Sequence, residues 1–297
     1  MKNTTIAFIF LLSICNFISL ASESQPREKE NWQIILDEKN HLEMIYIEPG
    51  SFNMGSPNTE LGRNIDEQLH EVILDSGYWI GKYEVTQSQW EKVLDGKTFP
   101  EINITLANPS GFLGENRPVE NISWFAAKKF CEILTQKEQA LGKLNEKYRY
   151  DLPTEAQWEY ACRAGTQTAL NTGKELSHPT SCLEADEAAW YWYNSGSQLA
   201  DTYGSHNVGL KKPNNWGLYD MHGNVAEWVQ DTYSFYRQEA ITNPSSSAKN
   251  GIGVCRGGSW SDSAWMCRSA DRAYYGSYCS MNNVGFRIVL IKIATPQ

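Results

Sequence analysis

The chain has 297 residues, of which 41% are hydrophobic and 21% are charged, and its formal net charge is −9. This length can bury a sizeable core, and the balance of apolar and charged residues excludes a disordered chain or a coiled coil. The negative charge argues against a nucleic-acid-binding protein, and also against electrostatic adhesion to an anionic membrane. The 11 Trp, 15 Tyr and 22 Gly residues favour a loop-rich domain whose aromatic side chains pack the loops or present a contact surface.

The first 21 residues predict an export signal. A positively charged N-terminus is followed by an apolar stretch over residues 6–20, and small residues near the end of this stretch predict cleavage after Ala21. The stretch is shorter than the about 20 apolar residues that a membrane-spanning helix needs. A second interpretation is a lipoprotein that is acylated at Cys15 and so anchored at the cell surface, rather than a secreted or periplasmic protein. Residues 22–40 are polar and charged, and we expect them to form a flexible tether.

Six cysteines remain once the export signal is removed, namely Cys131, Cys162, Cys182, Cys255, Cys267 and Cys279. An exported chain can hold such cysteines as disulfides, but their number allows many pairings. None of them is spaced as CxxC, and the five histidines are scattered along the chain. We therefore do not expect a structural zinc site.

The N-terminal half of the predicted domain begins with short strands and a helix. Residues 42–47 and 50–54 are predicted as strands around a Glu-Pro-Gly turn, and residues 78–85 as another strand. Thr86 and Gln89 have the spacing of a capping box, which predicts that a helix begins there. This helix is expected to end at Gly96, because glycine favours the left-handed conformation that closes many helices.

Two further helices are predicted before the chain becomes irregular. The second begins at Ser123, and the third begins with another capping box at Thr154 and ends at Gly165. Residues 166–283 have no long periodic segment, and short strands are expected near Trp228 and over residues 286–291. The pattern indicates one α+β domain over residues 41–291, followed by a tail at 292–297.

A series of motifs occurs in a fixed order along this domain. They are GSFNMG at 50–55, EVT at 84–86, RPV at 117–119 with SW at 123–124, RYDLPTEAQWEYACR at 149–163, WGLYDMHGNVAEW at 216–228, RGGSW at 256–260 and GFR at 285–287. Together they resemble the formylglycine-generating-enzyme (sulfatase-modifying factor) domain. The resemblance implies an irregular, loop-rich fold that is related to C-type lectins.

The resemblance does not extend to the reactive cysteine pair of the family's copper-dependent oxidases, which closely follows the Gly-Gly-Ser motif. Residues 261–266 contain no cysteine, and Cys267 resembles a later structural cysteine of the family instead. The resemblance therefore implies a Cys162–Cys267 disulfide, while the partners of the other cysteines stay open. Without two close thiolates to hold copper, we expect neither formylglycine generation nor a redox metal. The family's iron-dependent sulfoxide synthases need a separate N-terminal helical domain, for which this chain has no room.

A structural calcium site is also implied by the resemblance. Its ligands would be the side chains of Asp220 and Glu227 and the backbone carbonyls of Gly223 and Val225. Closely grouped oxygen ligands suit Ca²⁺. The alternative is that Glu227 only hydrogen-bonds the turn at Gly223 and that no metal is present.

Residues 260–283 interleave Tyr and Trp with Ser, Gly, Ala, Asp and Asn, a composition typical of antibody paratopes. The segment also resembles the C-terminal variable region of proteins that are diversified by retroelements, which mount variable residues on this same lectin-like fold. The candidate ligand-contacting residues are Ser261, Asp262, Trp265, Asp271, Tyr274, Tyr275, Ser277 and Tyr278. Asp271 and Arg272 could form the charged floor of a pocket or a surface ion pair.

These observations favour an exported, surface-displayed and monomeric binding protein whose ligand is a protein or a glycan, with no nucleic-acid partner. Two alternatives stay open. One is a metal-dependent oxidase of the same family with a rearranged site. The other is a structural envelope subunit that uses the fold to dock a protein partner.

Overall fold

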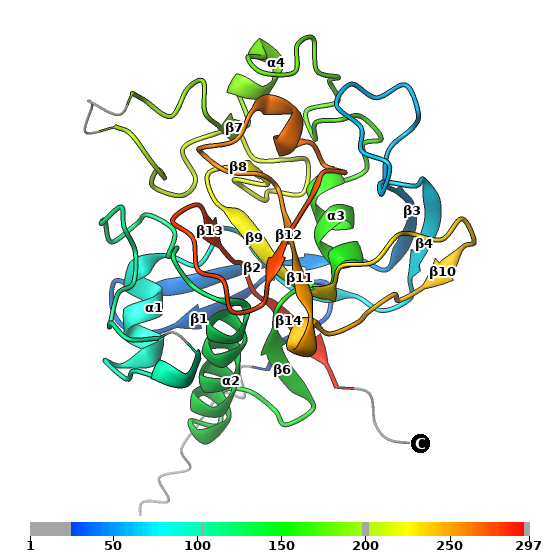
Figure 1. Ribbon diagram of the computed structural model, residues 1–297. Helices are drawn as coiled ribbons and strands as arrows, with labels where there is room; N and C mark the ends of the chain where they lie inside the picture. Colours follow the sequence, from blue (N-terminus) through cyan, green and yellow to red (C-terminus); the bar gives the residue numbers. More distant parts are fainter. Residues whose placement is uncertain (1–24, 103, 198–201, 294–297) are drawn as a thin grey trace, which may run out of the picture.

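A five-stranded sheet joins the two ends of the domain (Figure 1). In spatial order its strands are β1 (Trp32–Ile35), β2 (His41–Ile47), β5 (Tyr78–Gly81), β14 (Val289–Lys292) and β6 (Tyr148–Asp151), and all neighbours are antiparallel. The computed structural model describes residues 25–102, 104–197 and 202–293. Because the first and last strands share this sheet, it closes the irregular chain between them into one unit.

Smaller sheets carry the remaining strands. A four-stranded sheet has the order β12 (Arg272–Gly276), β11 (Ile252–Arg256), β9 (Ala226–Thr232) and β13 (Val284–Gly285). A three-stranded sheet has the order β10 (Ile241–Thr242), β4 (His70–Leu74) and β3 (Gly50–Met54), and β7 (Ala189–Trp190) pairs with β8 (His222–Gly223). The strands predicted near Trp228 and over residues 286–291 correspond to β9 and β14.

The predicted helices are present as α1 (Gln87–Leu94), α2 (Trp124–Ala140) and α3 (Glu155–Arg163), and a short α4 covers Leu183–Asp186. Single turns of 3-10 helix occur at Pro100–Ile102, Ala248–Asn250 and Ala264–Cys267. Both capping boxes are confirmed. Thr154 Oγ1 accepts from the amide of Gln157 at 3.1 Å, and the Gln157 side chain accepts from the Thr154 amide at 2.9 Å. These reciprocal bonds satisfy amides that the first helical turn leaves unpaired.

Aromatic side chains fill the core on both sides of the central strands. Trp90 of α1 stacks on Phe130 of α2 at 5.8 Å, and Phe286 packs edge-on against both rings. A second cluster surrounds Trp158 of α3, which lies against β3, β9 and β11. The predicted fold class, an irregular α+β domain, is therefore confirmed.

The prediction that residues 22–40 form a flexible tether is wrong for the described part of that segment. Residues 32–35 form β1 at the edge of the five-stranded sheet, and Ile34 is only 1% exposed. The indole of Trp32 donates to Tyr150 Oη at 3.1 Å, and the Glu30 carbonyl accepts from the Trp79 indole at 2.8 Å. The polar composition concealed alternating apolar residues that face the core.

The predicted export signal, including cleavage after Ala21 and acylation at Cys15, lies outside the described residues. Within the described residues, no helix combines the length and the apolar composition that crossing a membrane requires.

Truncating Ile34 tests whether β1 is part of the folded domain. We expect Ile34→Ala to lower the free energy of unfolding by about 2–5 kcal/mol, because it opens a cavity in a buried position. The neighbouring Ile35 is 51% exposed, so Ile35→Ala provides a matched control with a much smaller effect. Urea unfolding of both variants measures the difference, and equal effects would contradict the packing of β1.

Candidate functional site

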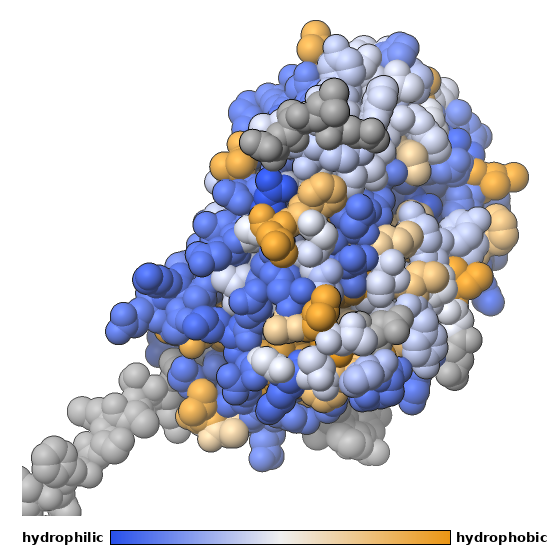
Figure 2. Space-filling model, turned by 60° about the vertical axis from the view of Figure 1, so that its left-hand side comes forward, coloured by the Kyte–Doolittle hydropathy of each residue, from blue (hydrophilic) through white to orange (hydrophobic). Residues whose placement is uncertain are grey.

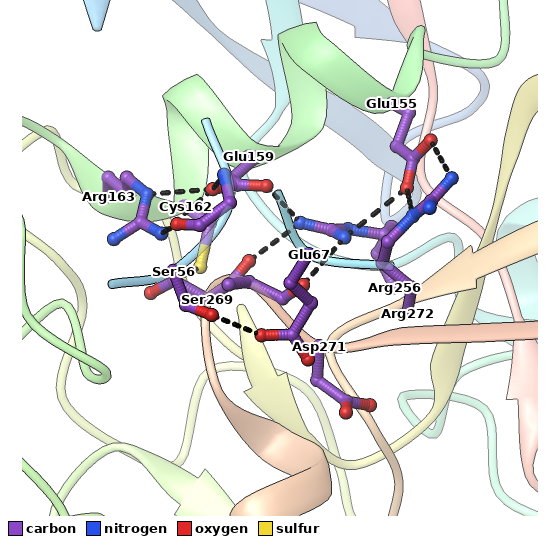
Figure 3. Close-up of polar contacts among 12 residues, drawn as sticks. Ser56, Glu67, Glu155, Glu159, Cys162, Arg163, Arg256, Ser269, Asp271 and Arg272 are labelled. Atoms are coloured by element: carbon purple, nitrogen blue, oxygen red, sulfur yellow. Dashed lines mark hydrogen bonds and ion pairs between the residues drawn. The ribbon is translucent and has the colours of Figure 1, made fainter. Parts of the chain in front are cut away.

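Buried ion pairs fix the C-terminal segment against α3 (Figure 3). Arg256 of β11 binds Glu159 at 2.5 Å and Glu155 at 3.3 Å. Arg272 of β12 also binds Glu155, at 2.7 Å, and Arg163 binds Glu159 from one helical turn away at 2.8 Å. All five side chains are buried. Because each guanidinium has several donors in a fixed plane, it can join more than two chain segments at once.

Another buried arginine, Arg268, joins the loop between β3 and β4 to the same segment. Arg268 donates to Glu60 at 2.6 Å, to Glu67 at 2.7 Å and to the Gly62 carbonyl at 2.8 Å. It also lies 3.3 Å from Asp271, which is 4% exposed. Burial raises the pKa of Asp271 to about 8 although Arg268 opposes the shift. Asp271 is therefore part of the interior, which corrects its prediction as a ligand contact or as part of a surface ion pair.

The tyrosines of β12 point to opposite sides of their strand, as the two-residue period requires. Tyr274 is 50% exposed and stacks on Tyr233 with ring centroids 4.1 Å apart. Tyr275 is half-buried and packs edge-on against Trp228 at 6.3 Å. Tyr274 is thus available to a ligand, whereas much of Tyr275 belongs to the core.

Two residues after β12 also differ in their exposure. Ser277 is buried and its hydroxyl donates to the carbonyls of Ala248 and Gly251, at 2.5 and 2.8 Å. Tyr278 is 59% exposed and lies against Phe125 of α2, with centroids 4.4 Å apart. Ser277 is therefore a structural residue, and Tyr278 presents an aromatic surface that is held by α2.

A polar cluster forms where the two ends of the 260–283 segment meet. The Ser259 hydroxyl donates to Asp262 at 2.6 Å and lies 3.1 Å from the Ser261 hydroxyl. The amide of Asn283 donates to both serine hydroxyls, at 3.2 and 3.1 Å. Trp192 also reaches this cluster, because its backbone amide donates to the Asp262 carbonyl at 2.8 Å. Ser259 and Asn283 belong to this cluster although neither is among the predicted candidate residues. Ser259 lies in the RGGSW motif, and Asn283 is the last residue of the 260–283 segment.

The candidate residues therefore do not form one continuous surface. Tyr274 and Tyr278 are exposed, Ser261 and Asp262 are half-buried, and Asp271 and Ser277 are interior. Trp265 is half-buried against a small cluster that includes Cys267. The face shown in Figure 2 is mostly hydrophilic and its hydrophobic residues lie in small separate groups, so it presents no broad apolar surface.

The predicted Cys162–Cys267 disulfide is not formed, and both residues are free thiols. The Cys162 sulfur instead lies 3.7 Å from the Ser269 hydroxyl and 4.0 Å from His222 Nε2. His222 Nδ1 lies 2.6 Å from the Cys267 carbonyl, so the imidazole contacts both cysteine residues. Burial raises the pKa of the Cys162 thiol to about 12 and raises that of Cys267 as well. Buried thiols of this kind are inert, because the reactive species is the thiolate.

The residues predicted to bind calcium lie around the turn between β8 and β9, with Asp220 before β8 and Glu227 inside β9. Asp220 accepts from the Gly209 amide at 2.7 Å through one oxygen, while its other oxygen is buried without a hydrogen-bond partner among the described residues. Gly223 has a φ of +76°, a left-handed conformation that glycine adopts without strain. The Val225 amide donates to Glu84 at 2.9 Å. The free oxygen of Asp220 fits a cation at this turn.

Glu227 has other partners than the prediction assumed. Both of its oxygens accept from Arg287 at 2.7 Å, and one also accepts from the Trp158 indole at 2.8 Å. Glu84, Asp220 and Glu227 are all buried here with one arginine between them, so negative charge is in excess. Burial and the two other carboxylates raise the pKa of Glu84 well above its usual value. Among the described residues no group of three or more His, Cys, Asp or Glu is arranged to hold a metal ion.

The chain is similar to known proteins both in sequence and in structure. Residues 34–292 match the family described as "Sulfatase-modifying factor enzyme 1-like domain". The chain is 31% identical over 239 residues to the chaperone protein LppX of Paenibacillus barcinonensis, a match that covers 68% of this chain and 75% of LppX. It is 25% identical over 289 residues to the formylglycine-generating enzyme of Mus musculus, covering 82% and 74% of the two chains. The solved structure of Treponema denticola variable protein 1 matches with a TM-score of 0.69 and 28% identity, covering 87% of this chain and 98% of that one.

The exposure of the cysteines predicts a simple pattern of thiol reactivity. Of the six described cysteines, only Cys279 is exposed, so for the chain without the export signal and its Cys15 we expect one fast-reacting thiol in the native state and six in denaturant. Titration with an aromatic disulfide reagent measures both numbers, and Cys279→Ser should abolish the native signal. Only four reactive thiols in denaturant would contradict the free state of Cys162 and Cys267.

Proposed function

Because this chain belongs to the sulfatase-modifying factor enzyme 1-like domain family, we propose that it is an exported binding protein that uses the family fold as a rigid scaffold. The observation that carries this proposal is the exposure of Tyr274 and Tyr278 on a segment that buried ion pairs hold in place. The ligand class is a protein or a glycan. Export rests on the predicted signal segment, with cleavage after Ala21 or acylation at Cys15 as the two routes.

The thiol chemistry supports binding over oxidation. Copper-dependent oxidases need two close thiolates, and the stretch that follows Ser259 offers only Cys267, which is buried. Cys255 is buried too, and burial raises the pKa of its thiol well above the usual value. Cys279 is exposed but has no cysteine partner among the described residues. We therefore propose that the chain works without a redox metal.

The exposed side chains have the properties of a recognition surface. Tyr274 and Tyr278 are aromatic anchors whose rings already rest on Tyr233 and Phe125, so little side-chain freedom is lost on binding. Ser261 and nearby polar groups can donate or accept hydrogen bonds to adapt to different ligands. The similarity to a protein named as a variable protein supports diversification of this segment by a retroelement.

Sequencing codons 255–290 in a population grown from one clone tests this proposal. If the segment is diversified, we expect substitutions between positions 261 and 283 at adenines, concentrated at exposed residues such as Tyr274 and Tyr278. The interior residues Asp271 and Ser277 should be spared, because their substitution would unfold the segment. An invariant segment, or substitutions spread evenly over exposed and interior codons, would contradict a diversified binding surface.

We also propose that calcium binds at the turn between β8 and β9. Asp220 and the carbonyls of Gly223 and Val225 would hold the ion, which would supply the positive charge that Glu84, Asp220 and Glu227 lack. The unpartnered oxygen of Asp220 supports this assignment. The role of the ion would be structural, because bound calcium stabilises the folded chain by mass action.

Removing calcium tests the site. We expect a chelator to lower the Tm of the protein, and added Ca²⁺ to restore it, with a Tm that rises with the logarithm of the Ca²⁺ concentration above Kd. Asp220→Asn should remove most of this response, whereas Asp95→Asn, an exposed substitution at the C-cap of α1, should leave it intact. A Tm that does not depend on calcium in the wild-type protein would contradict the proposal.

A further inference from the structure

An open cavity of about 850 Å³ lies beneath the segment that joins β9 to β11. This volume is within the range of small-molecule sites, which is about 300–1,000 Å³. Its walls include His70 of β4, Glu155 at the start of α3 and Asp231 of β9, and much of the lining comes from residues 234–241 and 244–246. No residue of the 260–283 segment lines it, so the cavity is separate from the surface considered above.

Asp231 gives this cavity an unbalanced charge. Its side chain is 8% exposed and accepts from the Glu155 amide at 2.7 Å and from the Ser246 amide and hydroxyl at 2.7 and 3.1 Å. No Lys, Arg or His of the described part of the chain forms an ion pair with it, whereas Arg256 and Arg272 balance the neighbouring Glu155. Burial and the charge of Glu155 raise the pKa of Asp231 to about 7. A buried carboxylate without a cation is costly, and a cationic ligand relieves that cost.

Aromatic rings stand beside this carboxylate. Phe235 and Tyr236 both line the cavity. Phe235 is 66% exposed, and its ring packs edge-on against Tyr233 with centroids 6.1 Å apart. The His70 ring lies 4.9 Å from the Tyr236 ring, and His70 Nδ1 lies 2.9 Å from the Gln68 carbonyl. If Nδ1 donates to that carbonyl, Nε2 of neutral His70 is an acceptor. Ring faces attract cations, and a carboxylate beside them defines where a positive group can sit.

The other charged groups do not favour an anion. Arg237 and Glu239 line the rim and carry opposite charges. The guanidinium carbon of Arg272 lies 3.9 Å from the centroid of the Tyr236 ring. The N–H donors of Arg272 are already bound to Glu155 and to the Asp66 carbonyl. A bare metal ion is also a poor fit, because Asp231 already accepts three hydrogen bonds and the cavity is much larger than an ion.

We propose that this cavity binds an organic ammonium ion. The positive group lies against Asp231, and the apolar part of the molecule packs on Phe235 and Tyr236. The site is independent of the proposed recognition by residues 260–283, so either can fail without the other.

Calorimetric titration of the folded protein tests the site with three probes, namely choline, N-acetyl-lysine methylamide and spermidine. We expect at least one of them to bind with a Kd in the millimolar range or tighter. For choline, 3,3-dimethylbutan-1-ol has the same shape without the charge, and we expect it to bind at least about 10-fold more weakly. Absence of binding by all three probes at about 10 mM, or equal affinity for the neutral analogue of a bound choline, would overturn the proposal.

Substitutions at the cavity test whether the ammonium ion binds there. Asp231→Asn keeps a carbonyl oxygen for the Glu155 amide, and we expect it to weaken binding at least about 10-fold. Phe235→Ala removes an exposed ring and should weaken binding without affecting the fold. Asp95→Asn, an exposed substitution that is remote in sequence from the cavity lining, is the control and should bind as the wild type does. Binding that survives both Asp231→Asn and Phe235→Ala would place the ammonium ion elsewhere and contradict the assignment.

Discussion

Buried arginines hold the irregular part of this domain in place. Five of them lie in the interior, each paired with at least one buried carboxylate: Arg163, Arg256, Arg268, Arg272 and Arg287. Much of the chain is loop, so backbone ladders alone cannot fix its course, and planar guanidinium groups connect segments that no sheet joins. Breaking such a pair by removing one partner costs about 3–5 kcal/mol. The loop fold therefore depends on charge balance as much as on its aromatic core.

The buried charge pairs also fix which residues of the C-terminal segment can contact a ligand. Arg268, Asp271 and Arg272 are anchors inside it, and the exposed Tyr274 and Tyr278 lie beyond them. A surface presented in this way is preorganised, so binding loses little chain entropy. The anchors must stay fixed while the exposed positions can change, which is what a scaffold for variable recognition needs. The same burial keeps the thiols protonated and is unfavourable for thiolate chemistry.

Local signals were readable from the sequence, and long-range charge pairing was not. The capping boxes at Thr86 and Thr154 and the ordered motifs predicted the helices and the family, because each depends on neighbouring residues. Arg268 and Glu67 are 201 positions apart, and no periodicity connects them. Asp271 was predicted as a ligand contact, and with Arg272 as a pocket floor or a surface ion pair, because its pairing with the buried Arg268 is not visible in the sequence. The prediction of a tether over residues 22–40 missed β1, because charged neighbours mask its short alternating pattern.

Amide hydrogen exchange over residues 262–276 tests the central claim most directly. If the arginines preorganise the segment, the wild-type amides of Ser269 and Asp271 exchange only through global unfolding, as slowly as those of Leu290 in β14. Arg268→Met should then open this segment and the loop at residues 56–67 locally, with exchange at least about 100-fold faster than at Leu290. Wild-type exchange by local opening, or full protection of the segment in Arg268→Met, would contradict a scaffold held by buried charge.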